Sequence, residues 1–306
     1  MRIRDIRHVG LLSPAVAAHA GYHVEALGLH PAGEDRHARY LQAASSEHHA
    51  LSLHPADRTG LHHLAFRLDG PAAVDAAATE LEGRGVPLAA QPDAQDEPGG
   101  GYGLRFLDPE NRCIELSAGV AEHPSRGSTG RAGPRRLCHV GLNTASFEQI
   151  VEFYTGVLGF RVSDRIEDQM AFLRCGRRHH AIVFSRADHP SVNHVAYAMA
   201  SVDDVMKGVS GLRARGQEPG WGPGRHGPGH NIFCYYEDPA GYVVELSSDL
   251  EEIEDEAAHE PAVWRRVPET ADLWGTAGPP GAEIRKAMAG DPDPGWAANG
   301  GRAARC

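Results

Sequence analysis

Apolar and polar residues in the second half of the chain follow two periods, one typical of helices and one typical of strands. One segment opens with the capping-box pattern Ser146-Phe147-Glu148-Gln149, and Gly159 is placed to end it. A second helical segment starts at Ser201, and Gly216 is its expected stop. The apolar positions at helical spacing are Phe147, Ile150, Val151, Tyr154 and Leu158, then Val202, Val205, Met206, Val209 and Leu212. Short β-rich runs such as MAFLRC and HHAIVF follow the first helix, so the pattern predicts helices alternating with groups of strands.

The chain also repeats itself. RHVGLLSP matches CHVGLNTA, LHHLAFRL matches VNHVAYAM, and LDPENRCIELS matches EDPAGYVVELS. The matched residues are His8 with His139, His63 with His194 and Glu115 with Glu245, separated by 131, 131 and 130 residues. A tandem duplication is therefore expected.

A shorter repeat lies inside each half, because 55 residues separate the two matched histidines in both halves. Each such histidine opens an apolar strand, which predicts an α+β fold of four βαβββ modules, two per domain. The expected parts are a first domain (1–122), a linker (123–136), a second domain (137–250) and a C-terminal segment (251–306). Within the last part, two Trp-containing patches predict a flap on the second domain at about 262–280, and the last ~20 residues have the composition of a loose tail.

Charge and hydropathy narrow the function classes. Thirty basic and 41 acidic residues give a formal net charge of −11, which disfavours nucleic acid and anionic membranes as partners. The sequence has no apolar run of about 18 residues, and its start, MRIRDIRHVG, lacks the apolar stretch of a secretory signal, so a cytoplasmic protein is expected. Nineteen histidines are unusual, because histidine is the commonest metal ligand and acid/base near neutral pH.

Glu245 lies in the apolar strand Tyr-Val-Val-Glu-Leu, where an unpaired buried carboxylate would cost several kcal/mol. It could face solvent at the strand end, and His139 and His194 could each be hydrogen-bonded core residues. Together, however, the three form a two-histidine, one-carboxylate set on three strands. Such a set leaves three coordination positions open on one face and suits Fe(II), although zinc or manganese would also accept it.

The segments FLRCGRRHHAIVF, VNHVAYAM and GPGRHGPGHNIFCYYEDPAGYVVELSS resemble the type I extradiol ring-cleaving dioxygenases of the vicinal oxygen chelate superfamily. The resemblance covers about residues 1–250 and implies a glyoxalase-like fold. It implies an Fe(II) enzyme, with Mn(II) possible, that adds both atoms of O₂ to a catechol and opens the ring beside the diol. The implied metal ligands are His139, His194 and Glu245. A homo-oligomer is also expected.

The resemblance further implies that His180 is the acid/base and that His226 and Tyr235 hydrogen-bond the catechol. The homoprotocatechuate branch of the family has, just before GPGRHG, an arginine that pairs with the substrate carboxylate; here the position holds Trp221. Trp221 and Phe172 are therefore expected to form apolar walls that favour an uncharged ring substituent, unless either is simply core.

The first half carries its own candidate set. His8, His63 and Glu115 match the ligands, and His48-His49 matches His179-His180. The counterparts of His226 and Tyr235, however, fall on Gln95 or Asp96 and on Leu104 or Arg105. We therefore expect a relic of the duplication, although a second metal site is conceivable.

Two rival functions remain open for the chain as a whole. One is another metalloenzyme on the same fold, such as a glyoxalase-like isomerase or epimerase. The other is a non-catalytic small-molecule binding or resistance protein.

Overall fold

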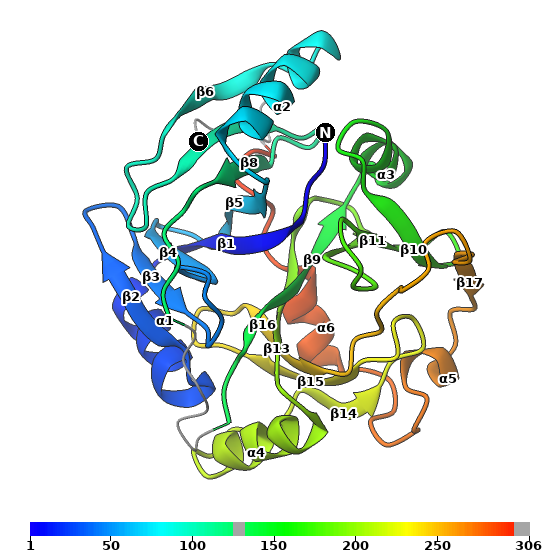
Figure 1. The fold of residues 1–306 in the computed structure, drawn as a ribbon. Coiled ribbons are helices and arrows are strands. Elements are labelled where there is room, and N and C mark those ends of the chain that lie inside the picture. The colour runs from blue at the N-terminus through cyan, green and yellow to red at the C-terminus, as the bar shows by residue number, and fades with distance from the viewer. Residues whose placement is uncertain (125–131, 297–306) are drawn as a thin grey trace.

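The structure is a computed structural model that describes residues 1–124 and 132–296. Two mixed sheets, each partly covered by helices, make up the two domains (Figure 1). The elements of the first domain are β1 (Asp5–Ser13), α1 (Val16–Tyr22), the π-helical turn η1 (His23–Leu27), β2 (His30–Glu34), β3 (Arg39–Gln42), β4 (Leu51–Pro55), β5 (Gly60–Arg67), α2 (Pro71–Gly83), β6 (Leu88–Ala94), β7 (Tyr102–Leu107) and β8 (Cys113–Ala118).

The second domain repeats this order. Its elements are β9 (Arg136–Thr144), α3 (Phe147–Gly156), β10 (Arg161–Ile166), β11 (Met170–Arg174), β12 (Ile182–Arg186), β13 (Ser191–Ala198), α4 (Val202–Arg213), β14 (Trp221–Arg225), β15 (Ile232–Glu237) and β16 (Val243–Ser248). The C-terminal segment adds β17 (Ala262–Trp264), α5 (Pro268–Ala271) and α6 (Ala282–Ala289).

Strand order shows that the two domains share one topology. The first sheet runs β2-β3-β4-β1-β5-β8-β7-β6, and the second runs β10-β11-β12-β9-β13-β16-β15-β14 with β17 added beside β10. In each sheet the two module-opening strands pair antiparallel at the centre, β1 with β5 and β9 with β13. The predicted α+β fold of four βαβββ modules is confirmed.

Both helices predicted in the second half are present, but their starts differ. The hydroxyl oxygen of Ser201 accepts a hydrogen bond from Asp204 N at 3.2 Å, as an N-cap should. Ser146 makes no such side-chain bond, so the predicted capping box is wrong. The backbone N–H groups of Ala145 and Ser146 are instead bound, both at 2.8 Å, by the carboxylate of Glu110 from the first domain.

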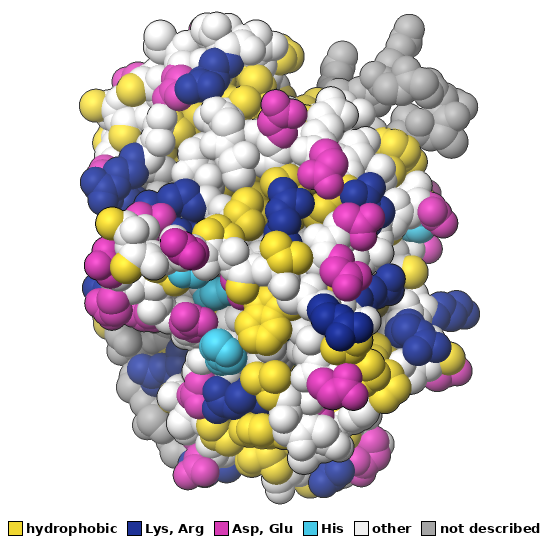
Figure 2. Space-filling view, turned by 90° about the vertical axis from the view of Figure 1, so that its right-hand side faces the viewer, with side chains coloured by type: hydrophobic (Ala, Val, Ile, Leu, Met, Phe, Trp, Pro, Cys, Tyr) yellow, Lys and Arg dark blue, Asp and Glu magenta, His cyan; other side chains and the backbone are white. Residues whose placement is uncertain are grey.

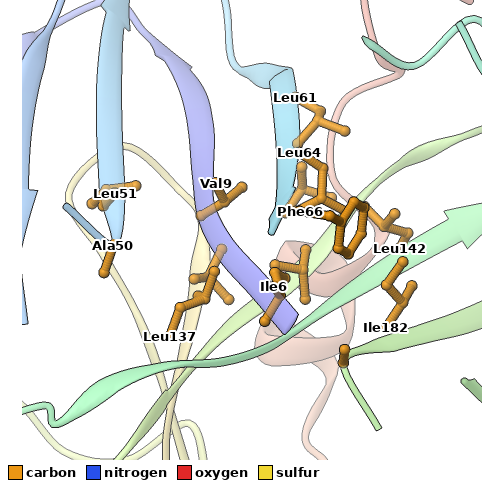
Figure 3. Close-up of a cluster of buried hydrophobic side chains, with 14 of the residues drawn as sticks. Ile6, Val9, Ala50, Leu51, Leu61, Leu64, Phe66, Leu137, Leu142 and Ile182 are labelled. Atoms are coloured by element: carbon orange, nitrogen blue, oxygen red, sulfur yellow. The ribbon is translucent and has the colours of Figure 1, made fainter. Parts of the chain in front are cut away.

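The domains share an apolar core. Figure 3 shows Ile6, Val9 and Phe66 of the first domain in one buried cluster with Leu142 and Ile182 of the second, where Phe66 lies beside Leu142. All five side chains are at most 4% exposed. Because this packing is continuous across the boundary, each sheet is held at a fixed position relative to the other.

The C-terminal segment is ordered further than the sequence suggests. β17 pairs with β10, and α6 packs on the strands of the second sheet. Beyond α6, Asp293 is buried and its carboxylate lies 3.1 Å from Nε of Arg112 in the first domain. The prediction of a loose tail is therefore wrong as far as residue 296, because this carboxylate is paired with a buried arginine; residues 297–306 lie outside the described part.

Figure 2 views the side of the molecule that carries β10, β17 and α5. Figure 2 shows basic, acidic and hydrophobic side chains interspersed on this face. Among the described residues, no helix is both long enough and apolar enough to cross a membrane.

Candidate metal centre

Three adjacent strands, β16, β13 and β9, bring the predicted ligands together. Ala196 on the middle strand is paired with His139 on one side and with Glu245 on the other, and His194 precedes it by two residues. Alternation along a strand therefore points all three side chains to one face. The two Nε2 atoms lie 3.0 Å apart, and Glu245 Oε2 lies 3.1 Å from that of His139 and 3.4 Å from that of His194.

A glycine makes this convergence possible. A Cβ at position 141 would lie 2.4 Å from Nδ1 of His194, closer than any side chain tolerates. Gly141 therefore gives the imidazole the space that it occupies. In the sequence, Gly141 follows His139 by two residues, but no pattern gave this glycine a role.

Amide side chains fix the orientation of the ligands. Asn193 Oδ1 lies 2.8 Å from Nδ1 of His194, so that nitrogen carries the proton and Nε2 keeps its lone pair. Asn231 Nδ2 donates to Glu245 Oε1 at 2.9 Å. Glu245 Oε2, in contrast, is buried and has no hydrogen-bond partner among the described residues. The sequence did not identify Asn193 or Asn231, because asparagine beside a ligand is not distinctive without geometry.

The electrostatics of the two histidines match the form that binds a cation, and those of Glu245 show a carboxylate that needs a cation beside it. Burial lowers the pKa of His139 and of His194 to about 3, which leaves both imidazoles neutral. Burial also raises the pKa of Glu245, because its carboxylate is fully enclosed. A divalent ion among these three atoms would compensate the carboxylate and accept both lone pairs. The donor set therefore fits a first-row divalent metal.

A cavity of about 790 Å³ opens beside His139 and His194. The five other residues singled out from the sequence all line it: Phe172, His180, Trp221, His226 and Tyr235. Nε2 of His226 lies 3.0 Å from the Tyr235 hydroxyl, and its Nδ1 lies 2.8 Å from Ala271 O. Trp221 stacks on Tyr235 at 5.2 Å, and His180 packs between Phe172 and His139.

The C-terminal segment supplies much of the remaining wall. Its lining residues are Arg265, Arg266, Val267, Pro268, Thr270, Ala271, Pro279, Pro280, Arg285, Met288 and Ala289. The sequence indicated packing of this segment from its tryptophans but assigned it no place at the site. The repeat could not predict that this segment lines the cavity, because the segment follows the last repeated module.

The first domain closes its equivalent site differently. The Nε2 atoms of His8 and His63 lie 2.7 Å apart. Arg105, however, binds Glu115 Oε2 through Nη2 at 2.8 Å and Nε at 3.0 Å. Arg105 is paired with Glu115 in the sheet as Tyr235 is with Glu245, so the counterpart of Tyr235 is Arg105 and not Leu104.

Comparisons with known proteins agree with this architecture. The family model described as the Glyoxalase/Bleomycin resistance protein/Dioxygenase superfamily matches residues 5–116 and 136–246. The chain is 32% identical over 195 residues to Metapyrocatechase 2 of Cupriavidus necator, a match that spans 57% of this chain and 60% of that protein. It is 28% identical over 272 residues to the manganese-dependent 2,3-dihydroxybiphenyl 1,2-dioxygenase of Geobacillus genomosp. 3, covering 80% and 85%.

Solved structures extend the likeness to nearly the whole chain. The Mn(II)-bound glyoxalase from Novosphingobium aromaticivorans is 38% identical, with a TM-score of 0.87 and coverage of 92% of this chain and 94% of that one. The substrate complex of homoprotocatechuate 2,3-dioxygenase from Brevibacterium fuscum, at 22% identity, has a TM-score of 0.81 with coverage of 93% and 92%, a likeness of fold. This chain belongs to the Glyoxalase/Bleomycin resistance protein/Dioxygenase superfamily.

Proposed function

We propose that the protein is a metal-dependent extradiol dioxygenase that opens a catechol ring beside its two hydroxyl groups with O₂. The observation that carries the proposal is the convergence of the three-ligand set with His180, His226 and Tyr235 around one cavity. An isomerase of the same fold or a non-catalytic binding protein would not need these three residues together. The curated relatives named as dioxygenases support the same choice.

His139, His194 and Glu245 would hold the metal, and Fe(II) is the proposed ion, with Mn(II) as the alternative. When bound, the metal supplies open positions at which both catechol oxygens and O₂ can meet, so that proximity is built in. Manganese stays open because one relative is named manganese-dependent and one solved neighbour is Mn(II)-bound, whereas another relative is named iron-dependent.

Other residues around the cavity would bind the substrate and transfer a proton. His226 and the Tyr235 hydroxyl, already hydrogen-bonded to each other, can bind a catechol oxygen. His180 lines the cavity and would take up and return a proton. Burial, with nearby histidines adding to it, lowers the pKa of His180 well below its ordinary value. The ring is therefore in the neutral form that a proton acceptor needs, but the same shift weakens it as a base.

The substrate pocket contains opposing signals. Phe172 and Trp221 form apolar walls, and a buried unpaired carboxylate against them would cost several kcal/mol. Exposed Arg265, Arg266 and Arg285 line the outer part of the same cavity. We expect the walls beside the metal to dominate and a neutral alkyl- or aryl-catechol to be preferred over homoprotocatechuate.

The test of this preference is kcat/KM, which reports differential transition-state binding. A preference of tenfold or more for the carboxylated catechol, about 1.4 kcal/mol in the opposite direction, would overturn the apolar pocket and leave the dioxygenase proposal standing.

The function itself is tested by metal analysis of anaerobically purified protein combined with a panel of catechols. Four groups of described residues could hold a metal ion, and we expect about one ion per chain, at His139, His194 and Glu245, because Arg105 already binds Glu115 in the first-domain group. We also expect a yellow ring-fission product formed with O₂ uptake. A metal-loaded protein that leaves every catechol intact but isomerises a thiohemiacetal of methylglyoxal would establish the glyoxalase-like alternative instead.

A further inference from the structure

His179 has no role in the proposed function, yet it is 1% exposed and lies directly behind His180. Its Nδ1 lies 2.9 Å from Nδ1 of His180. Its Nε2 lies 3.2 Å from Oδ2 of Asp164, within ion-pair distance, and makes no hydrogen bond of regular geometry to any described residue. The three side chains form a line that runs from β10 to the cavity.

The proton positions along this line follow from the carboxylate. Burial would raise the pKa of Asp164, but contacts with His179, Trp264 and the Ala262 N–H outweigh it and lower the pKa. A carboxylate attracts an N–H and repels a lone pair, so the tautomer of His179 that faces Asp164 favourably has its proton on Nε2 and its lone pair on Nδ1. Nδ1 of His180 must then be the donor in the 2.9 Å contact.

The consequence appears at the opposite nitrogen of His180. With the proton on Nδ1, Nε2 carries a lone pair, and it makes no hydrogen bond to any described residue. His180 is also one of the residues that line the cavity. The ring therefore offers a base, and not an N–H donor, to whatever binds beside the metal ligands.

We propose that Asp164 and His179 are positioning residues that hold His180 in the Nδ1–H tautomer, with Nε2 free to take a proton from the bound catechol. This inference rests on the proposed function. In the step it supports, a substrate O–H bond breaks, its proton forms a bond to Nε2 of His180, and the electron pair stays on the substrate oxygen. The resulting imidazolium is stabilised through Nδ1–H and His179 by the charge of Asp164, and it returns the proton later in the turnover.

The C-terminal segment holds Asp164 in place. Ala262 N donates to Oδ1 at 2.8 Å, and Nε1 of Trp264 donates to Oδ2 at 2.7 Å, both from β17. Asp164 also sits beside an irregularity in the pairing of β10 with β11, where it is paired with Phe172. The flap strand thus fixes the carboxylate that faces His179.

The first domain lacks this carboxylate although it keeps the histidine pair. His48 and His49 repeat the contact, with 3.1 Å between their Nδ1 atoms. The position equivalent to Asp164, beside the same irregularity in β2, is Gly33. The fold therefore forms without a carboxylate at this position, which indicates that Asp164 serves the site and not the module.

The tautomer can be measured without turnover. Long-range ¹H–¹⁵N correlation spectra of the zinc-loaded, diamagnetic protein should show His180 as the Nδ1–H tautomer, with His180→Asn and His179→Phe identifying the signals. Asp164→Asn should shift His180 toward the Nε2–H form, because an amide cannot accept at both of its ends. A wild-type His180 already in the Nε2–H form, or spectra unchanged in Asp164→Asn, would overturn the proposal.

Turnover gives the second readout, with iron-loaded protein and 4-methylcatechol as the probe. Asp164→Asn should lower kcat roughly 10- to 100-fold, less than loss of the acid/base itself, while KM and iron content change by less than about threefold. Trp264→Phe is the matched control, because it removes a donor to the same carboxylate but leaves Asp164 facing His179. Equal losses of kcat in both variants would mean that Asp164 only anchors the flap, and would overturn the relay.

The inference can still be tested if Asp164→Asn does not fold or if the proposed function fails. If Asp164→Asn does not fold, His179→Phe breaks the same line while Asp164 keeps its two contacts with β17, and an unchanged kcat in that variant contradicts the inference. If wild-type protein cleaves no catechol, the proposed function fails, whereas the spectra still decide the tautomer.

Discussion

The two domains bury the same His-His-Glu set at the same register and compensate its charge in different ways. In the first, the guanidinium of Arg105 binds Glu115. In the second, Tyr235 takes the position of that arginine and leaves Glu245 Oε2 without a hydrogen-bond partner among the described residues. A buried carboxylate is tolerated only when it is paired or binds a metal. Glu115 Oε1 also lacks a hydrogen-bond partner among the described residues, but only Glu115 lies against a cation. The first site therefore contains its own cation, and the second offers its carboxylate to one from outside.

The residues on the strand beside Tyr235 and beside Arg105 also differ between the two sites. Trp221, paired with Tyr235 in the second sheet, corresponds to Ala90, paired with Arg105 in the first. A duplicated module thus keeps its strands and its His-His-Glu set while the residues around that set change. Shared ligands alone are a poor indication of a shared function.

The largest effect is expected from removing a ligand of the second site, compared with the same change in the first site. His139→Ala should abolish both tight metal binding and turnover, because a three-ligand site has no spare protein ligand, and the same holds for His194→Ala and Glu245→Ala. The matched variant His8→Ala should leave both nearly intact. Metal content and catechol turnover are the measurements. Stoichiometric metal in His139→Ala would remove it from the ligand set, and loss of half the metal in His8→Ala would show two sites.

The next effect concerns the histidine that faces the cavity. His180→Asn should retain the metal and bind catechol but lower kcat by about 10²- to 10⁴-fold, the usual contribution of a general acid/base. Its counterpart His49 is equally buried, and His49→Asn should leave kcat unchanged. Steady-state kinetics near neutral pH measure both. An unaltered kcat in His180→Asn would exclude the acid/base role.

The repeat pattern was sufficient for the fold, and the resemblance to the extradiol dioxygenases supplied the residues around the cavity. The duplication predicts two copies of one module pair, and the three ligands lie on its central strands. The closing wall from the C-terminal segment could not be predicted, since it follows the repeat and is placed by single contacts such as Trp264 with Asp164. The role of Arg105 was equally hidden, because a shift of one residue in the alignment decided between it and Leu104.

A smaller effect is expected from a substitution that makes the first site resemble the second. Arg105→Tyr removes the internal cation and leaves the fully buried Glu115 uncompensated, so we expect the metal content to rise from about one ion per chain to two. Added metal should raise the thermal stability of the variant more than that of wild type. Arg105→Lys retains a positive charge and should stay at one ion. A metal content of one in Arg105→Tyr would show that the geometry of the first site, and not its arginine, excludes the ion.

The smallest effect is a pH dependence that belongs to the first site alone. Glu97 lies 4.0 Å from Arg105, and the second domain has the cavity-lining Pro228 at the position 131 residues later. Burial, with the charge of Glu115 adding to it, raises the pKa of Glu97 to about 8. Since the folded state holds this proton more tightly than the unfolded chain, the associated stability is present below about pH 4.5 and is lost as the pH rises through 8.

Glu97→Gln mimics the protonated side chain and should remove that loss. Relative to wild type, the variant should therefore gain stability from pH 5 to about pH 8 and level off above it, as measured by the difference in melting temperature at each pH. Glu34→Gln, a change of an exposed glutamate in the same domain, should run parallel to wild type over this range. If the curves of Glu97→Gln and wild type were also parallel, Glu97 would be ionised in the folded protein, and Arg105 would be neutralising two carboxylates instead of one.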